Sequence, residues 1–407
     1  MSEPEAEPEG DRASRAVHYD PYDYAIHEDP YPTYARLRAE APLYRNEDHD
    51  FWALSRYDDV NAAFRDSARF SSADGVSIEP SATGPQAART MSFLAMDPPR
   101  HTRMRGLVSR AFTPRRIADL EPRVRELARQ HLDRFAGERR CDFVRDFAAR
   151  LPMDVISEML GVPEADRDML RGWADAVVHR EDGMYDIPPA GMAAAAQLLA
   201  YFADVVADRR KQPCDDLSAA LLTAEVEGDR LDDAEVVGFL FLMIIAGNET
   251  TAKLLGNALY WLWRNPEQRR AVEADPRLIP RWVEETLRYD GSTQALARTL
   301  TSDVELHGEH LRAGDRVVLL IGSGNRDERV FPDADRFDVR RDTSDMLSFG
   351  HGLHFCLGAA LARLESRVAL EEVQTRLRGW EIDPAGLVRV HSVNVRGFAA
   401  LPLELER

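Results

Sequence analysis

The sequence predicts a mostly α-helical fold with a minor β part, and three observations support this prediction. From about residue 99 to 290, apolar residues recur every three or four positions, which is the spacing of one helix face. Within that stretch, residues 231–266 form a single uninterrupted helical pattern. Short segments that alternate apolar and polar residues, as strands do, lie near residue 50 and after residue 292.

This longest predicted helix has recognisable ends. Asp232 or Asp233 is placed to cap its N-terminus, and Pro266 lies just past its end. At a rise of 1.5 Å per residue, the helix would span roughly 50 Å. Its apolar run, 236–247, is shorter than the roughly 18 residues that a membrane span needs, and Glu249 follows closely. We therefore expect a buried central helix.

The other expected elements are shorter. A helix is expected in "PYPTYARLRAEAP" and a β-hairpin in "LYRNEDHDFWALS". Residues 71–90 are rich in Ser, Ala, Gly and Pro, and so long a loop inside a compact domain is usually functional. After residue 292, strands that turn at 307–309 precede a coil over 326–345. A last helix is expected to follow Cys356 and to end near Arg378.

Length and charge narrow the class of protein. The chain has 407 residues and 44% hydrophobic residues, enough for a sizeable core. We expect one folded domain over 18–407, preceded by a disordered acidic tail over 1–17. The formal net charge of -18 argues against nucleic-acid binding, which needs a basic face.

Cysteine usage and the N-terminus indicate the compartment. The three cysteines are widely spaced, and no Cys-x-x-Cys motif is present, so the sequence predicts neither a disulfide framework nor a zinc ribbon. The first residues, "MSEPEAEPEGDRAS", are acidic and lack an apolar signal-peptide core. We expect a cytoplasmic protein without a membrane anchor.

The segment "SFGHGLHFCLGAAL", residues 348–361, contains a lone cysteine, Cys356, among glycines at the start of a helix. Four interpretations are open for this thiol. It is a plain core cysteine, a nucleophile with His354 as its base, a zinc ligand with His351 and His354, or a haem ligand. Zinc is disfavoured because three or four clustered ligands are required and a second cysteine is missing.

Local chemistry favours haem. Backbone N–H groups of a glycine-rich loop and of a helix N-terminus supply positive potential that stabilises a thiolate. Glycine also allows the backbone to approach a flat macrocycle closely. The neighbouring Phe349 is placed to shield the sulfur of Cys356 from water.

The same segment resembles the haem-binding signature of the cytochrome P-450 family, Phe-x-x-Gly-x-(His or Arg)-x-Cys-x-Gly. The matching residues are Phe349, Gly352, His354, Cys356 and Gly358. The resemblance extends from about residue 20 to 404 and is closest to the soluble bacterial type. It implies the cytochrome P-450 fold, with the long central helix over the haem and the cysteine loop beneath it. It also implies haem b as cofactor and Cys356 as the axial iron ligand.

Residues 246–251, "AGNETT", interrupt the apolar face of the central helix. Alone, they would be read as a capping or surface patch. Because they directly follow twelve apolar residues, we expect them to be buried, and buried polar groups need a partner or a task. The resemblance implies that Ala246 leaves room for oxygen beside the iron. It further implies that Glu249 and Thr250 deliver protons to the oxygen that is activated.

A second motif, "HTRMR", places His101 and Arg105 at i and i+4. Alone, this is an ordinary basic helix face. The resemblance implies that both residues bind the haem propionates, together with Arg298 and His354. Half-buried carboxylates need cationic or hydrogen-bonding partners, so four such groups for two propionates is a reasonable number.

The third motif, "EETLR", places Glu285 and Arg288 on one helix face. Alone, it is a surface pair worth a few tenths of a kcal/mol. The resemblance implies a buried structural pair that is completed by Arg336 of "DRFD" in the later coil.

The same resemblance implies which positions line the substrate pocket. These positions are mostly apolar or small, which predicts a lipophilic, medium-sized substrate such as a macrolide, polyketide, terpenoid or steroid. The regions are the 71–97 loop, 173–192, the central helix and the chain near residues 294 and 394. The specific candidates are Leu94, Ile245, Ala246, Gln294, Ala295, Asn394 and Val395.

The resemblance implies a haem-thiolate monooxygenase that inserts one atom of dioxygen into such a molecule, by hydroxylation or epoxidation, in bacterial secondary or lipid metabolism. The Gly-x-Gly-x-x-Gly pattern of a nicotinamide site is incomplete in "GSGNRD", so electrons are expected from a ferredoxin and its reductase. Four arginines form either a docking surface for an acidic ferredoxin or an ordinary solvated helix face. They are Arg103, Arg110, Arg115 and Arg116.

Three other functions compete with this one. A peroxide-dependent peroxygenase would typically lack the pair formed by Glu249 and Thr250. A haem carrier or sensor would need the thiolate but no proton relay. A cysteine hydrolase would use Cys356 with His354 as base.

Overall fold

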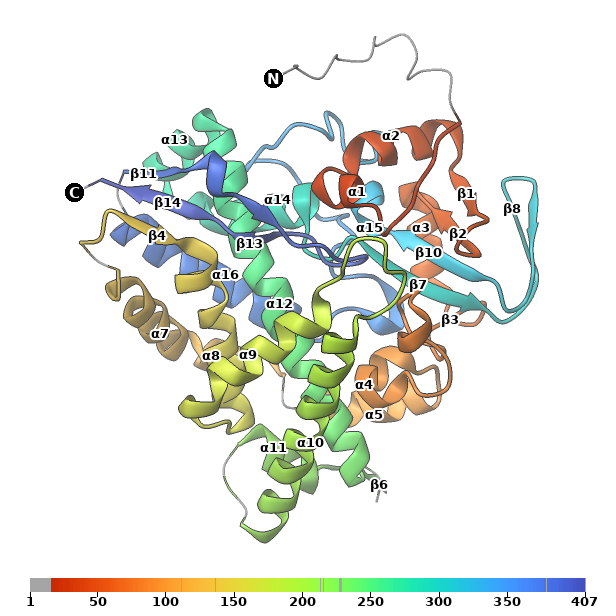
Figure 1. Ribbon diagram of the computed structural model, residues 1–407, viewed down its shortest axis with the longest axis horizontal. Helices are drawn as coiled ribbons and strands as arrows, with labels where there is room; N and C mark the ends of the chain where they lie inside the picture. Colours follow the sequence, from red (N-terminus) through yellow and green to blue (C-terminus); the bar gives the residue numbers. More distant parts are fainter. Residues whose placement is uncertain are drawn as a thin grey trace.

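The computed structural model describes residues 16–406 apart from 111, 136, 213, 215, 227–228 and 378. All but the last two residues of the expected tail, 1–17, lie outside the described residues. The chain is mostly helical with small sheets, as the sequence predicts, and one long helix crosses the middle of the molecule (Figure 1).

The central helix, α12, spans Asp233–Arg264 and confirms the predicted long helix. Asp232 caps it by accepting a hydrogen bond from the backbone N–H of Glu235, whose side chain in turn accepts one from the backbone N–H of Asp232. Pro266, the first residue of α13, follows its C-terminal cap. Most side chains of α12 are buried, because other helices pack against it on several sides.

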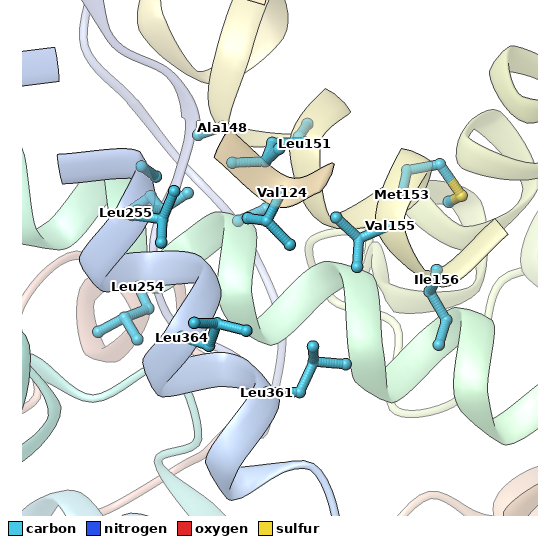
Figure 2. Close-up of a cluster of buried hydrophobic side chains, with 14 of the residues drawn as sticks. Val124, Ala148, Leu151, Met153, Val155, Ile156, Leu254, Leu255, Leu361 and Leu364 are labelled. Atoms are coloured by element: carbon cyan, nitrogen blue, oxygen red, sulfur yellow. The ribbon is translucent and has the colours of Figure 1, made fainter. Parts of the chain in front are cut away.

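The helices around α12 form the larger part of the molecule. They are α5 (Arg100–Ser109), α6 (Pro114–Asp119), α7 (Glu121–Asp133), α8 (Arg150–Leu160), α9 (Glu164–Val178), α10 (Pro189–Lys211), α11 (Leu217–Thr223), α13 (Pro266–Ala274), α14 (Ile279–Asp290) and α16 (Ala359–Arg376). Figure 2 shows the part of the core between four helices, in which Val124 of α7, Val155 of α8, Leu255 of α12 and Leu364 of α16 are buried together. Burial of this apolar surface provides the main stabilisation of the helical part.

Two helices, α10 and α12, are long and apolar enough to cross a membrane by length and composition. In the structure α12 is the buried core helix, as expected from its short apolar run. One face of α10 packs on α9 and α12, burying Leu198, Phe202 and Val206.

A five-stranded sheet forms the main β part. Its strands are β1 (Leu43–Asn46), β2 (Phe51–Leu54), β10 (Arg316–Leu320), β7 (Ala295–Leu300) and β3 (Phe70–Ser71), in that order. The β1–β2 hairpin confirms the predicted one. Strand β7 pairs antiparallel with β10, so successive side chains of β7 point to opposite faces of the sheet. This alternation decides which residues of β7 reach the site.

Smaller strands and helices complete the chain. The strands are β4 (Arg140–Asp142), β5 (Glu225–Val226), β6 (Asp229–Arg230), β8 (Val304–Leu306), β9 (Glu309–Leu311), β11 (Trp380–Ile382), β12 (Val388–Arg389), β13 (Phe398–Ala400) and β14 (Pro402–Leu405). The short helices are α1 (Tyr24–Glu28), α2 (Tyr31–Glu40), α3 (Tyr57–Arg65), α4 (Ala88–Met91) and α15 (Ile321–Gly324). Strand β4 lies inside the stretch predicted to be helical, because its partner is the distant β14, which no local pattern reveals.

The loop after β3 is fastened to the segment that follows α9. The buried carboxylate of Glu79 pairs with Arg180, and the hydroxyl of Ser81 donates to Asp186 at 2.6 Å. The 71–97 loop and the segment between α9 and α10, two regions expected to line the pocket, are therefore joined directly.

Candidate active site

A large cavity lies between α12 and the cysteine segment. Its empty volume, which includes space open to solvent, is about 1350 Å³. One wall is α12, and the opposite wall is the cysteine segment with the first turns of α16. Strand β7 and the end of the 71–97 loop contribute further lining residues.

Cys356 lines this cavity at the N-terminus of α16. Its backbone N–H donates to the carbonyl oxygen of Phe349 at 2.9 Å, which closes the loop that carries it. Burial raises the pKa of the Cys356 thiol, whereas hydrogen bonds from the backbone N–H groups of Gly358 and Ala359 lower it. These amides and the helix N-terminus would stabilise the sulfur as a thiolate.

Glycine is required at one position of this loop. Gly352 has a φ of 72°, in the left-handed region, and a Cβ there would lie 2.6 Å from the carbonyl oxygen of Phe64. A side chain would therefore push the cysteine segment away from α3.

Phe349, which was expected to shield the sulfur, lines the cavity, and the guanidinium of Arg363 lies 4.5 Å from its ring centroid. Arg363 pairs with Glu284 at 2.7 Å, which holds it there. Its positive charge, with that of Arg105, lowers the pKa of Cys356. An aromatic ring and two cations thus surround the sulfur.

The structure brings together the four residues expected to bind the haem propionates, His101, Arg105, Arg298 and His354. The imidazole rings of His101 and His354 have centroids 4.2 Å apart. Within the described residues, the ring nitrogens of both histidines and Nη1 of Arg105 are buried without a hydrogen-bond partner of good geometry. Arg298 is buried and donates to its neighbour's carbonyl, that of Ala297, at 2.8 Å.

Positive charges on these four groups would repel one another, which disfavours the protonated forms of the two histidines. Burial and the nearby charge of Arg298 lower the pKa of His354 to about 3, and burial lowers the pKa of Arg298 to about 10. Unpaired buried donors cost free energy that an anion would recover. A macrocycle with two carboxylates, bound with its iron at the sulfur of Cys356, fits this donor set.

On the opposite wall, α12 presents its polar interruption to the cavity. Ala246 is exposed to the cavity although it lies in the middle of a buried helix. Gly247 and Thr250 line the same wall, and the hydroxyl of Thr250 donates to the carbonyl of Ala246 at 2.7 Å. Small side chains at 246 and 247 leave open space opposite the sulfur.

Glu249 is buried but points away from the lining of the cavity. Its Oε2 lies 3.2 Å from Nζ of Lys253, and its other oxygen accepts a hydrogen bond from Asn248 at 3.4 Å. The carboxyl of Asp175 on α9 is also hydrogen-bonded to Glu249. The predicted pair is therefore split, with Thr250 in the cavity and Glu249 behind it.

Among the residues missed by sequence reasoning are three ionisable ones in or beside the cavity. Lys253 is four residues after Glu249, a spacing that could have indicated the pair. Glu365 of α16 lines the cavity, and burial raises its pKa well above its usual value, since its Oε2 is buried and unpaired within the described residues. No local signal marked Glu365, because α16 carries other acids, among them Glu371 and Glu372. Asp175 gave no local signal, because its partner lies on another helix.

The predicted structural pair is buried, with one correction. Nη2 of Arg288 lies 2.7 Å from Oε1 of Glu285. The third cation is Arg341, whose Nε lies 3.3 Å from the same carboxylate, and the prediction of Arg336 was wrong. The neighbouring Phe337 turns into the core, so the Arg336 side chain is exposed and contributes only its carbonyl oxygen to Arg288 and Arg341.

The predicted pocket residues divide into two groups. Leu94 and Ala246 line the large cavity, whereas Ile245 does not and packs against the helical core. The others line two small cavities beside Tyr19 and Pro21, contrary to the prediction: Gln294, Ala295, Asn394 and Val395. Strand alternation turns Ala295 away and brings Leu296 and Arg298 to the large cavity instead.

The four predicted docking arginines also divide. Arg103 lies 2.8 Å from Glu235, and Arg110 donates to the carbonyl of Glu225 at 3.1 Å, so both hold the start of α12 and its preceding hairpin. Arg115 and Arg116 are exposed on α6, which packs against α16.

Comparison with known proteins agrees with this geometry. A sequence model described as "Cytochrome P450" matches residues 190–277 and 275–386. Cytochrome P450 123 of Mycobacterium tuberculosis is 56% identical over 388 residues, which cover 95% of this chain and 96% of the relative. The chain belongs to the cytochrome P450 family. Cytochrome P450 monooxygenase PikC of Streptomyces venezuelae is 41% identical, over 93% of this chain and 92% of PikC.

Solved structures of this P450 family match the fold. The crystal structure of CYP109E1 from Bacillus megaterium, in complex with testosterone, has a TM-score of 0.88 and 32% identity. The match covers 95% of this chain and 100% of that chain. The predicted fold and family are thereby confirmed. The protein is a cytochrome P450 monooxygenase with a haem-thiolate cofactor.

Proposed function

We propose that this P450 oxidises a neutral lipophilic molecule of about steroid size, by hydroxylation or epoxidation. The observation that carries the proposal is the distribution of charge in the cavity. Within the described lining, the charged or titratable side chains other than Cys356 are Arg298, His354 and Glu365, two at the carboxylate-binding rim and one on the side of the cysteine. The wall around Leu94, Met243 and Leu296 offers apolar surface, which favours an uncharged ligand.

The structure of CYP109E1 with testosterone supports the size of this substrate, since that protein has the same fold at 32% identity. A steroid would contact the wall between α12 and β7. A role in bacterial secondary or lipid metabolism is part of the same proposal. So is a location in the cytoplasm, which is supported by the free cysteines and the absence of any disulfide among the described residues.

The residues of the site would divide the work as follows. Cys356 would hold the haem iron, Phe349 would shield the sulfur, and the carboxylate-binding groups would be His101, Arg105, Arg298 and His354. Haem b, when bound, supplies the binding and activation of dioxygen. Ala246 leaves space opposite the sulfur. The hydroxyl of Thr250, which lies in the cavity, would pass on a proton. Glu249, the preceding residue in the chain, would then supply a new proton to Thr250.

Electrons would come from a ferredoxin that docks beside the cysteine segment. Leu353 and Phe355 are exposed there, at 45% and 42%, and the exposed Arg115 and Arg116 lie on α6, which packs on the helix that begins beside Cys356. Charge reversal of both arginines should lower the rate of first electron transfer and its dependence on salt. Arg277→Glu, at an exposed arginine outside this surface, is the control. Equal rates in all three proteins would contradict the docking surface.

A ligand-binding titration tests the substrate proposal. Testosterone and other neutral steroids or macrolides should shift the haem absorption spectrum of the purified holoenzyme, whereas charged fatty acids and amines should not. Leu296→Asp should abolish the shift because it places a charge in the apolar wall. A shift given only by charged ligands would overturn the proposal.

A further inference from the structure

Arg363, in the second turn of α16, is held in a way that the roles assigned above leave unexplained. Its guanidinium lies 4.5 Å from the centroid of the Phe349 ring. The same guanidinium donates two hydrogen bonds, of 2.7 and 2.9 Å, to the two carboxylate oxygens of Glu284 on α14. Two such parallel bonds fix the plane of a guanidinium, which a single surface contact does not. An arginine fixed against an aromatic ring calls for a reason beyond solubility.

Phe349 connects this arginine to the sulfur of Cys356. The carbonyl oxygen of Phe349 accepts a hydrogen bond from the backbone N–H of Cys356 at 2.9 Å, and both residues line the large cavity. The positive charge of Arg363 reaches the sulfur, since it lowers the pKa of the Cys356 thiol. The ion pair presents its positive end to Phe349, and its negative end lies on the neighbouring helix α14.

The other cation near the sulfur, Arg105, has a different proposed partner. It also lowers the pKa of Cys356. It belongs to the four groups assigned to the haem carboxylates, so a propionate would counter its charge. Arg363 is not among the described residues that line the cavity, and its counter-charge comes from Glu284. The field that Arg363 exerts at the sulfur is therefore set by this chain alone.

We propose that Arg363 is a positioning residue that raises the reduction potential of the haem iron, and that Glu284 limits this effect by countering part of its charge. Arg363 would act through Phe349 and Cys356, without contact to the substrate. The inference rests on the proposed role of Cys356 as the iron ligand. It adds to that role a pair of residues that adjusts how readily the iron accepts an electron.

The change in charge gives the direction of the effect. Reduction adds one electron, supplied by the ferredoxin or by dithionite in the test, and no bond of the protein forms or breaks. A nearby positive charge stabilises the reduced form more than the oxidised form, so it raises the potential. It also draws electron density from the sulfur, which acts in the same direction. The Arg363 side chain is 39% exposed, so water screens its charge and the effect is moderate.

The test compares three substitutions that each remove one charge. Arg363→Gln removes the positive charge, whereas Glu284→Gln removes the counter-charge and keeps one carbonyl oxygen as acceptor for the guanidinium. Arg367→Gln is the matched control, because Arg367 lies one turn further along α16 and pairs with Glu121 and Glu371. All these pairs are partly exposed, so the three variants should fold and bind haem.

The reduction potential of each holoenzyme is measured by titration with dithionite, without added ligand, and the absorption spectrum checks that the spin state is the same. We expect Arg363→Gln to disfavour reduction by about 3–10-fold. At about 59 mV per tenfold, the potential falls by about 30–60 mV. Glu284→Gln should shift the potential in the opposite direction, by about 2–5-fold. Arg367→Gln should stay within about 2-fold of the wild type.

A second readout follows the sulfur itself. When carbon monoxide is bound to the reduced iron, its stretching frequency falls as the sulfur donates more electron density. The frequency should therefore fall in Arg363→Gln and rise in Glu284→Gln. Arg363→Lys keeps the charge and should recover at least half of the loss in potential, although it loses the planar contact with Phe349. A merely structural role of the pair would change the stability of the protein but neither of these two measurements.

The outcomes separate this inference from the proposed function. Equal potentials in wild type and Arg363→Gln, or an equal fall in Arg367→Gln, overturn the inference while a thiolate-type carbon monoxide spectrum leaves Cys356 as the ligand. A shift of the same sign in Arg363→Gln and Glu284→Gln also overturns it, because breaking the pair, and not the charge, would then be the cause. A wild-type protein without the spectrum of a thiolate-ligated haem overturns the proposed role of Cys356, and the inference with it.

Discussion

Two buried glutamates, Glu285 on α14 and Glu249 on α12, have similar local sequences and opposite surroundings. Each has a basic residue one helical turn later, Arg288 and Lys253 respectively. Glu285 accepts hydrogen bonds from Arg288, Arg341 and a backbone N–H, all with fixed geometry. Glu249 instead shares its carboxylate with a cation and a second acid.

The difference shows how one kind of residue serves two purposes. A carboxylate whose partners are all permanent donors stays ionised and fixes the backbone segments that supply them. A carboxylate that faces another acid can gain and lose a proton. We therefore assign a structural role to the cluster of Glu285 and a chemical role to that of Glu249.

The largest expected effect comes from breaking the saturated cluster. Glu285→Ala leaves the buried guanidinium of Arg288 without its counter-charge, and removal of one partner of a buried pair costs about 3–5 kcal/mol. We expect little soluble, haem-containing protein, measured by the yield and the absorption spectrum. Glu273→Ala, at an exposed pair with Arg269, is the control and should behave as wild type. Normally coloured, stable Glu285→Ala protein would contradict the comparison.

A smaller effect on folding and a large one on chemistry are expected for Glu249→Gln. The variant should fold and bind haem, because Asp175 can ionise and take over Lys253 as its partner. The coupled fraction, which is the share of NADPH electrons that does not appear as hydrogen peroxide, should fall about 10-fold, since glutamine cannot pass on a proton. Peroxide and NADPH assays measure it. A variant that unfolds as Glu285→Ala does would remove the distinction between the two clusters.

The third prediction concerns pH. Burial and Glu249 raise the pKa of Asp175 to about 8, so the folded chain holds a proton that the unfolded chain releases at lower pH. The resulting stabilisation is present at acidic pH and is lost as the pH rises toward about 8. The difference in Tm between wild type and Asp175→Asn should therefore shrink from acidic pH to about pH 8 and stay constant above it. A difference independent of pH would show that the acids do not share a proton.

The smallest expected effects are on stability, and they show whether Arg341 or Arg336 is the third member of the Glu285 cluster. Arg341→Ala removes a cation from Glu285 and should cost about 1–2 kcal/mol of unfolding free energy. Arg336→Ala changes an exposed side chain and should stay within about 0.5 kcal/mol. Denaturant titration of both variants measures this. The reverse order would restore Arg336 to the cluster.

The Glu285 cluster and the pocket wall also show where sequence reasoning stopped. Arg288 is three residues from Glu285, so helix geometry alone predicted the pair. Arg341 lies in an irregular coil, where no helix or strand periodicity indicates which side chains are buried. In the same way, strands were expected after residue 292, but the register of β7 against β10 decided that Leu296, rather than Ala295, reaches the cavity.

The sequence by itself determined the central helix and the cysteine loop, because local spacing and residue chemistry specify these features. The cationic groups near the loop were expected only from the resemblance to the P450 family. Only the tertiary structure decided that Arg341 completes the Glu285 cluster and that Asp175 meets Glu249. Such contacts join residues far apart in the chain. They depend on how helices and coils pack around a shared core, and no single stretch of sequence records that packing.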